Sequence, residues 1–156
     1  MRTPGIALAA LLGCASGPPT LTRYAGDDSE TLDAFRGRVV VLTFWAEWCK
    51  PCHEEFPLLV EAVEGEGNGV VLAAVYYRMK PAPGSSLFPW LAQQPPAFSQ
   101  RVYWPNTSLL AEYDVRTLPK TYVLARDGTV VKEFRGQIRE AQELRQALQQ
   151  ASISAR

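Results

Sequence analysis

The chain contains a single Cys-x-x-Cys motif, in the pentapeptide Trp-Cys-Lys-Pro-Cys at residues 48–52. The motif directly follows the apolar run at residues 39–45, which predicts a strand covered on both faces. Residues 51–64 predict a helix, because apolar side chains recur there at helical spacing. Cys49 therefore lies at a helix N-terminus, where unpaired N–H groups and the helix dipole favour a thiolate. Cys52 lies about one turn further on, so the pair predicts a reversible disulfide.

Length and charge limit the class of protein. The chain has 156 residues, enough for one domain with a substantial core. Its 16 basic residues balance its 16 acidic residues, and there is no basic run, so the sequence argues against a nucleic-acid partner. No apolar stretch reaches the roughly 18 residues that a membrane-spanning helix requires.

The N-terminus differs in composition from the rest of the chain. Residues 1–13 combine one arginine with a short apolar segment and end directly before Cys14, as in a bacterial lipoprotein signal peptide. We therefore expect cleavage before Cys14, lipidation of its thiol and attachment to a membrane. Residues 14–26 are rich in small residues and proline and predict a flexible tether, followed by the domain at 27–156. An ordinary signal peptide or a misplaced start codon is the alternative.

The cysteine count supports this interpretation. The chain has three cysteines, so lipidation of Cys14 leaves Cys49 and Cys52 as an isolated pair. A zinc site needs four ligands, and the sequence offers no second cysteine pair and only one histidine, His53. We expect neither a metal nor another cofactor, and a static structural disulfide remains the alternative role for the pair.

The remaining pattern alternates strands and helices. A second apolar run at 70–76 completes a strand–helix–strand unit with the first, which predicts a parallel pair. The segment at 78–96 is rich in proline and predicts only a short helix, at 85–94. The C-terminal part predicts a helix at 107–113, a hairpin of strands at 121–125 and 130–135 that turns at Asp-Gly, and a closing helix at 139–151.

Several motifs together resemble the thioredoxin superfamily, and within it the TlpA/ResA-like bacterial thiol–disulfide oxidoreductases. The segment at 44–52 is similar to the active-site segment of that family, and residues 35–40 are similar to its lead-in. Residues 113–121 resemble the segment that carries its cis-proline, and Glu55 and Pro57 also fit the TlpA-like branch. The resemblance implies an α/β, thioredoxin-like fold, with a central mixed β-sheet flanked by helices.

The motif assigns a role to each of its residues. Cys49, at the start of the helix, is the expected nucleophile, and Cys52 is the resolving thiol that releases a reduced partner. Pro51 has the backbone angle required at a first helical position, and Lys50 adds positive charge near the sulfurs. Trp48 is expected to form a partly exposed wall of a docking surface.

The resemblance also implies a docking loop and reveals one departure. The peptide bond between Leu118 and Pro119 is expected to be cis, with the backbone of Leu118 pairing with a substrate strand and Gly136 nearby. Thioredoxins carry a buried aspartate six residues before the first cysteine, but this chain has Thr43 there. The sequence therefore lacks an internal carboxylate at that position to take a proton from Cys52.

These observations predict an exported thiol–disulfide oxidoreductase that faces the periplasm or the cell exterior. The resembling branch implies that it reduces disulfides of other exported proteins, such as cytochrome c apoproteins or copper-site proteins. It also implies a thiol donor of electrons, for which a membrane electron-transfer protein is a candidate. We expect a monomer. A disulfide oxidase or isomerase is one alternative, and a copper-binding metallochaperone that uses the two cysteines as soft ligands is another.

Overall fold

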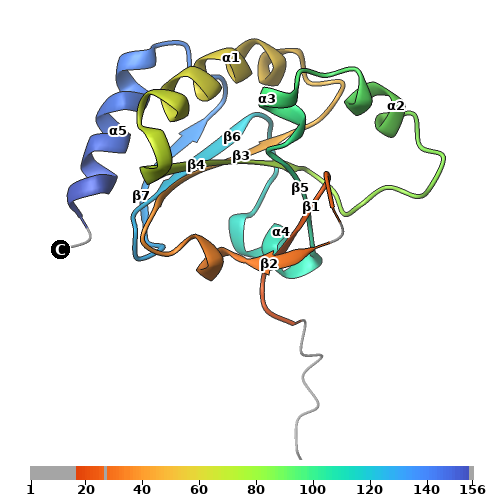
Figure 1. Cartoon of the computed structure of the whole chain (residues 1–156), viewed down its shortest axis with the longest axis horizontal. Helices are drawn as coiled ribbons and strands as arrows, with labels where there is room; N and C mark the ends of the chain where they lie inside the picture. The colour runs from red at the N-terminus through yellow and green to blue at the C-terminus, as the bar shows by residue number, and fades with distance from the viewer. Residues whose placement is uncertain (1–16, 27, 155–156) are drawn as a thin grey trace, which may run out of the picture.

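The computed structural model describes residues 17–26 and 28–154, which form a seven-stranded sheet with helices on both sides (Figure 1). In chain order the elements are β1 (Thr20–Arg23), β2 (Ser29–Thr31), η1 (Leu32–Phe35), β3 (Val39–Trp45), α1 (Lys50–Gly65), η2 (Gly67–Gly69), β4 (Val70–Tyr76), α2 (Leu87–Ala92), α3 (Pro96–Ser99), β5 (Val102–Pro105), α4 (Thr107–Tyr113), β6 (Lys120–Leu124), β7 (Val130–Arg135) and α5 (Ala141–Ile153). The predicted bounds of β3, β4, α4 and β7 are confirmed.

The sheet is mixed, as predicted. Its strand order is β2-β1-β5-β4-β3-β6-β7, with parallel pairing of β4 to both β3 and β5 and antiparallel pairing elsewhere. Helices α1 and α5 lie on one face of the sheet, and α4 lies on the other (Figure 1). The expected thioredoxin-like α/β fold is confirmed, with β3 between β4 and β6 in the sheet and the Cys-x-x-Cys motif after its C-terminal end, at the start of α1.

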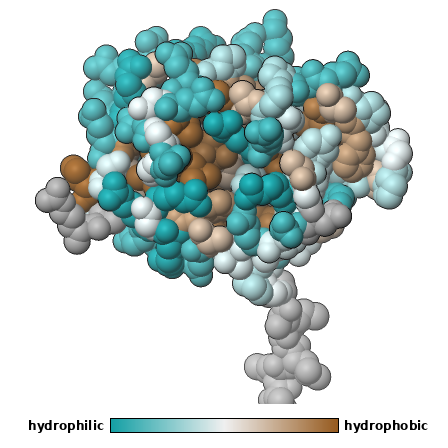
Figure 2. Space-filling model, viewed as in Figure 1, coloured by the Kyte–Doolittle hydropathy of each residue, from teal (hydrophilic) through white to brown (hydrophobic). Residues whose placement is uncertain are grey.

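Strand β3 shows why its apolar run is continuous. Successive side chains of a strand point to opposite faces, and Val39, Val41 and Trp45 join the core under α1 and α5. The alternate residues, Val40, Leu42 and Phe44, join a second core on the α4 side. Figure 2 shows hydrophilic residues over most of one face, with hydrophobic residues visible mainly in its centre and toward α2.

The predicted tether at 14–26 is wrong for part of its length. Residues Thr20–Arg23 form β1, which lies in the sheet between β2 and β5, and Leu21 is completely buried. The sequence did not indicate this four-residue strand, because prolines precede it, its partner β2 is only three residues long, and its other partner, β5, lies about 80 positions further along the chain. The folded domain therefore includes residues before position 27, whereas the predicted signal peptide and Cys14 lie outside the described residues.

A core substitution tests the packing under α1. Leu59 is completely buried between α1 and the sheet, so Leu59→Ala is expected to lower the free energy of unfolding by about 2–5 kcal/mol. The half-buried neighbour Leu58 is a matched control, and Leu58→Ala is expected to cost clearly less. Urea unfolding of the oxidised protein measures both values, and equal losses would contradict the packing described.

Candidate active site

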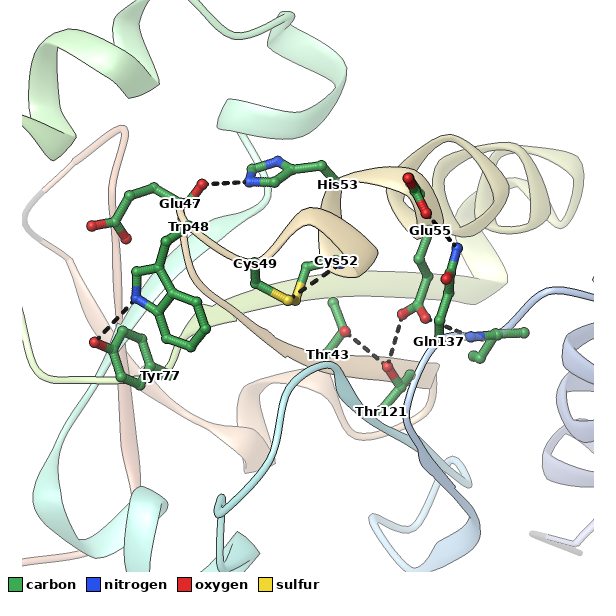
Figure 3. Close-up of a disulfide and its surroundings, with 12 residues drawn as sticks. Thr43, Glu47, Trp48, Cys49, Cys52, His53, Glu55, Tyr77, Thr121 and Gln137 are labelled. Atoms are coloured by element: carbon green, nitrogen blue, oxygen red, sulfur yellow. Dashed lines mark hydrogen bonds between the residues drawn. A yellow bond between two sulfur atoms is a disulfide. The ribbon is translucent and has the colours of Figure 1, made fainter.

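The two cysteines meet at the N-terminus of α1. The chain leaves β3 at Trp45 and turns, with the Cys49 N–H donating to the Ala46 carbonyl at 3.1 Å. Cys49 is the N-cap residue of α1, and its Sγ accepts from the backbone N–H of Cys52 at 3.3 Å. The sulfurs form a disulfide, with Pro51 in the first turn of the helix (Figure 3). The strand-to-helix junction thus has the predicted geometry.

The disulfide lies beneath the surface, beside an exposed tryptophan. Cys49 is 4% exposed and Cys52 1% exposed, so their burial differs only slightly. Trp48 is 63% exposed, and its indole N–H donates to the Tyr77 hydroxyl at 3.4 Å while the two rings pack edge to face. Trp48 therefore borders the disulfide on its solvent side, with Tyr77 holding its ring in place.

Lys50 acts on the disulfide less directly than expected. Its side chain is largely exposed, and its ammonium lies 3.7 Å from the Glu54 carboxylate, one turn along α1. Solvent screens an exposed pair of this kind, so its electrostatic influence is small. The positive charge that the sequence places beside the sulfurs is thus shared with a neighbouring acid.

Hydrogen bonds hold Glu47 at both its backbone and its side chain. Its carbonyl contacts His53 Nε2 at 2.8 Å, and its carboxylate accepts from the Tyr76 hydroxyl at 2.8 Å. The pKa of Tyr76 is raised, mainly by burial and secondly by the hydrogen bond to the Glu47 carboxylate. The half-buried His53 ring packs against Trp45 and Trp90. His53 and Tyr76 thus brace the turn that leads to Cys49.

A buried carboxylate lies one turn after Cys52. Glu55 is 1% exposed; its Oε2 accepts from the Ile138 backbone N–H at 2.7 Å, and its Oε1 accepts from the Thr121 hydroxyl at 3.2 Å. Burial raises the pKa of Glu55 from 4.5 to about 7, against the opposing effect of the Ile138 and Thr121 hydrogen bonds and of the nearby Thr43 hydroxyl. Thr43 occupies the strand position of the missing aspartate, so α1 provides the internal acid that the strand lacks.

Sequence reasoning did not assign Glu55 this role, although two observations pointed to it. Residues three apart on a helix share a face, so Glu55 had to lie on the same side of α1 as Cys52. The adjacent Phe56 and the nearby Leu59 belong to the buried face of the same helix. A carboxylate on the buried face of a helix is expected to be buried itself. Glu54 lies outside that face and is exposed.

The expected docking residues come together from two loops. The Leu118–Pro119 peptide bond is cis, and the Pro119 carbonyl accepts from the Gly136 N–H at 3.0 Å. Gly136 has a φ of 93°, a left-handed conformation that favours glycine. Leu118 packs against the core cluster that contains both cysteines. Both loops therefore meet at the same end of the sheet as the disulfide.

Among residues 17–26 and 28–154, no group of three or more His, Cys, Asp or Glu side chains is arranged to hold a metal ion. Within the same ranges, no helix has the length and apolar character needed to cross a membrane.

Comparisons with known proteins agree with this site. Residues 18–149 match the model of the Redoxin family. The chain is 30% identical to the thiol-disulfide oxidoreductase ResA of Bacillus subtilis over 112 residues, which are 70% of this chain and 60% of that protein. It is 25% identical over 118 residues to the thiol:disulfide interchange protein CycY of Rhizobium leguminosarum, covering 75% of this chain and 60% of CycY. The chain thus spans less than two thirds of the length of these relatives.

Solved structures share the fold over most of the chain. A Chlorobium tepidum protein described as a thiol:disulfide interchange protein DsbE superimposes with a TM-score of 0.69 at 27% identity, covering 85% of this chain and 91% of that one. An exposed lipoprotein thioredoxin of Streptococcus pneumoniae superimposes with a TM-score of 0.66 at 23% identity, covering 84% and 97%. The chain belongs to the Redoxin family, as a TlpA/ResA-like member of the thioredoxin superfamily.

Proposed function

We propose that the protein is a thiol–disulfide oxidoreductase that cycles between the Cys49–Cys52 disulfide and the corresponding dithiol. The observation that carries this proposal is the disulfide at the N-terminus of α1, which lies beside the cis-proline loop and close in sequence to the buried Glu55. A structural staple would not require a buried acid one turn away. The names of ResA and CycY support the same reaction class.

In the reducing direction, the Cys49 thiolate attacks one sulfur of a substrate disulfide. A bond forms between Cys49 and the substrate, and the substrate's other sulfur leaves as a thiolate that takes up a proton. Cys52 then loses its proton and attacks the Cys49 sulfur, which releases the second substrate thiol and restores the Cys49–Cys52 disulfide. Two electrons pass to the substrate, and a separate thiol donor must return two electrons to the protein.

We assign Glu55 as the acceptor of the Cys52 proton. Its carboxylate is buried on the same face of α1, and its pKa of about 7 lets it gain and lose a proton near neutral pH. The N-terminus of α1 favours a thiolate at Cys49, whose sulfur accepts from the Cys52 N–H. The two cysteines would thus be activated by different groups, Cys49 by the helix end and Cys52 by Glu55.

We propose that substrate docks between Trp48 and the cis-proline loop. The exposed Trp48 ring forms one side, and the Leu118 backbone together with Pro119 and Gly136 forms the other. The hydrogen bond from Gly136 to the Pro119 carbonyl holds the two loops in register. An extended substrate segment would then pair with the Leu118 backbone beside Cys49.

We also propose that the protein is exported and tethered to the membrane through a lipid on Cys14, with residues 1–13 removed. The support is the composition of the N-terminal segment. Labelling with a radioactive or clickable fatty acid in the native host tests this anchor, and Cys14→Ser should abolish the label while leaving the folded domain intact.

The protein would act as a monomer on the disulfides of exported proteins such as cytochrome c apoproteins or copper-site proteins.

The reduction potential tests the direction of electron flow. Equilibration of the folded domain with glutathione or dithiothreitol buffers should give a value near the roughly −270 mV of thioredoxin if it is a reductant. A value near the roughly −120 mV of DsbA would instead indicate an oxidase. Stoichiometric Cu(I) binding without reduction of insulin disulfides would replace the oxidoreductase assignment with a metallochaperone.

A further inference from the structure

Three buried polar side chains form one chain of hydrogen bonds under the active site. Glu55, Thr43 and Thr121 are each 1% exposed or less. The Thr121 hydroxyl donates to Glu55 Oε1 at 3.2 Å and lies 2.8 Å from the Thr43 hydroxyl, where either oxygen can be the donor. Figure 3 shows this chain running from Thr43 through Thr121 to Glu55, next to the disulfide.

Backbone geometry places the two threonines together. Thr43 and Thr121 are directly opposite each other in the antiparallel pairing of β3 with β6. Thr43 has the same strand parity as Val41 and Trp45, which lie in the core under α1. Both hydroxyls therefore point to the side of the sheet where α1 carries Glu55. A cross-strand threonine pair in this position forms part of the surroundings of the acid.

The two oxygens of Glu55 have different kinds of donor. The Ile138 backbone N–H on Oε2 can only donate, so it stabilises the carboxylate and offers nothing to a carboxylic acid proton. The Thr121 hydroxyl on Oε1 can rotate and can either donate or accept. A proton that arrives at Glu55 is therefore accommodated on Oε1, where Thr121 can turn from donor to acceptor.

We propose that Thr43 and Thr121 are positioning residues of the proton acceptor, and that their hydroxyl chain reverses direction when Glu55 changes charge. With Glu55 ionised, Thr43 donates to Thr121 and Thr121 donates to Glu55. With Glu55 protonated, Glu55 donates to Thr121 and Thr121 donates to Thr43. The chain keeps its buried hydroxyls hydrogen-bonded in both states, which matters because an unpaired buried polar group is costly.

This inference rests on the proposed function, since it concerns the proton that Cys52 releases. In this step the Cys52 S–H bond breaks and an O–H bond forms at Glu55, so only a proton passes from Cys52 to Glu55. The groups around the Glu55 carboxylate are Thr43 from β3, Thr121 from β6 and the Ile138 N–H from the β7–α5 loop, and Cys52 precedes Glu55 by three residues on α1. The neighbouring Glu54 instead bonds to Gln137 and Lys50.

The test is a titration of Glu55 in the oxidised full chain, in which neither cysteine of the disulfide titrates. Carbon-13 NMR of the side-chain carboxyl should give a wild-type midpoint near 7. Thr121→Val removes a hydrogen bond to a charged oxygen, so the midpoint should rise by about one pH unit. Thr43→Val should raise it by a smaller amount, because Thr43 acts through Thr121. Thr121→Ser and Thr43→Ser keep the hydroxyls and should stay at the wild-type value.

Two results would overturn the proposal. If the Glu55 midpoint in Thr43→Val equals the wild-type value, Thr43 does not take part in the hydrogen-bonded network. If the serine variants shift the midpoint as far as the valine variants do, the effect comes from packing and not from the hydroxyls.

A kinetic experiment follows the resolving step in a mixed disulfide between Cys49 and a small thiol. Thr43→Val should alter its pH profile when Glu55 is present and leave it unchanged in Glu55→Gln. The titration needs no turnover, so it is decided separately from the proposed activity.

Discussion

Replacing Cys49 by serine is expected to abolish disulfide reduction, whereas Cys52→Ser is expected to accumulate a covalent complex with the substrate. The reason is the order of the two attacks. Without Cys49 no mixed disulfide forms, and without Cys52 the mixed disulfide forms but has no internal thiol to resolve it. The measurement is insulin reduction for activity, and non-reducing gel electrophoresis after acid quenching in the native host for trapping.

The two variants control for each other, because each removes one sulfur from the same disulfide. The effect on stability should be similar in both, since both lose the same short crosslink. Only their trapping should differ. Equal trapping by both variants would refute the assignment of Cys49 as the nucleophile, since the two sulfurs differ little in exposure and that measure does not distinguish them.

Replacing Glu55 by glutamine is expected to slow the resolving step at neutral pH by about a hundredfold, the lower end of the usual contribution from a positioned general base. In the wild-type protein the rate of this step should rise with pH through about 7, because Glu55 must be ionised to accept a proton. In Glu55→Gln the rise should move toward about 8.5, the pKa of an unassisted thiol. Stopped-flow measurement of mixed-disulfide resolution across pH checks both expectations.

The same variant has a predicted effect on stability. Because the pKa of Glu55 is about 7 when folded and 4.5 as its ordinary value, the folded state holds this proton after the unfolded state has lost it. The stability of the oxidised wild-type protein should therefore fall as pH rises from about 4.5 to about 7, by up to about 3 kcal/mol from this group. The free energy of unfolding of Glu55→Gln, measured with urea, should not show this fall between pH 4.5 and 7.

Glu61→Gln provides the matched control, because Glu61 lies on the exposed side of the same helix. The change in formal charge is identical, but no buried carboxylate is removed. Its unfolding free energy should follow the wild-type pH dependence, and its resolving rate should be unchanged. A loss of pH dependence in Glu61→Gln as well would mean that net charge, rather than the buried site at Glu55, controls the profile.

Local pattern was sufficient for the central elements. The strands at 39–45 and 70–76 are long, apolar and bounded by turn residues, so their positions followed from hydrophobic run length alone. The helix at 107–113 was also predicted, and Asn106 caps its N-terminus by accepting from the Leu109 N–H. These features depend on neighbours in sequence, which the chain itself displays.

The short strands β1 and β5 were not predictable in the same way. Strands β1 and β5 are four residues each; two prolines precede β1, and a proline ends β5. β1 and β5 pair with each other across about 80 positions of sequence, and their other partners are β2 and β4. A short segment gains little from propensity without such partners. The tether prediction failed at Thr20–Arg23 for this reason.

The sequence by itself determined the disulfide chemistry: Cys49 and Cys52 had to lie at a helix N-terminus, because strand and helix patterns meet there. It also showed that Thr43 leaves the strand without an acid. Only the tertiary structure decided where the acid lies. Packing of α1 over β3 and β6 buries Glu55 against Thr121 and raises its pKa to about 7. Desolvation depends on atoms brought from distant parts of the chain, and no local pattern contains that information.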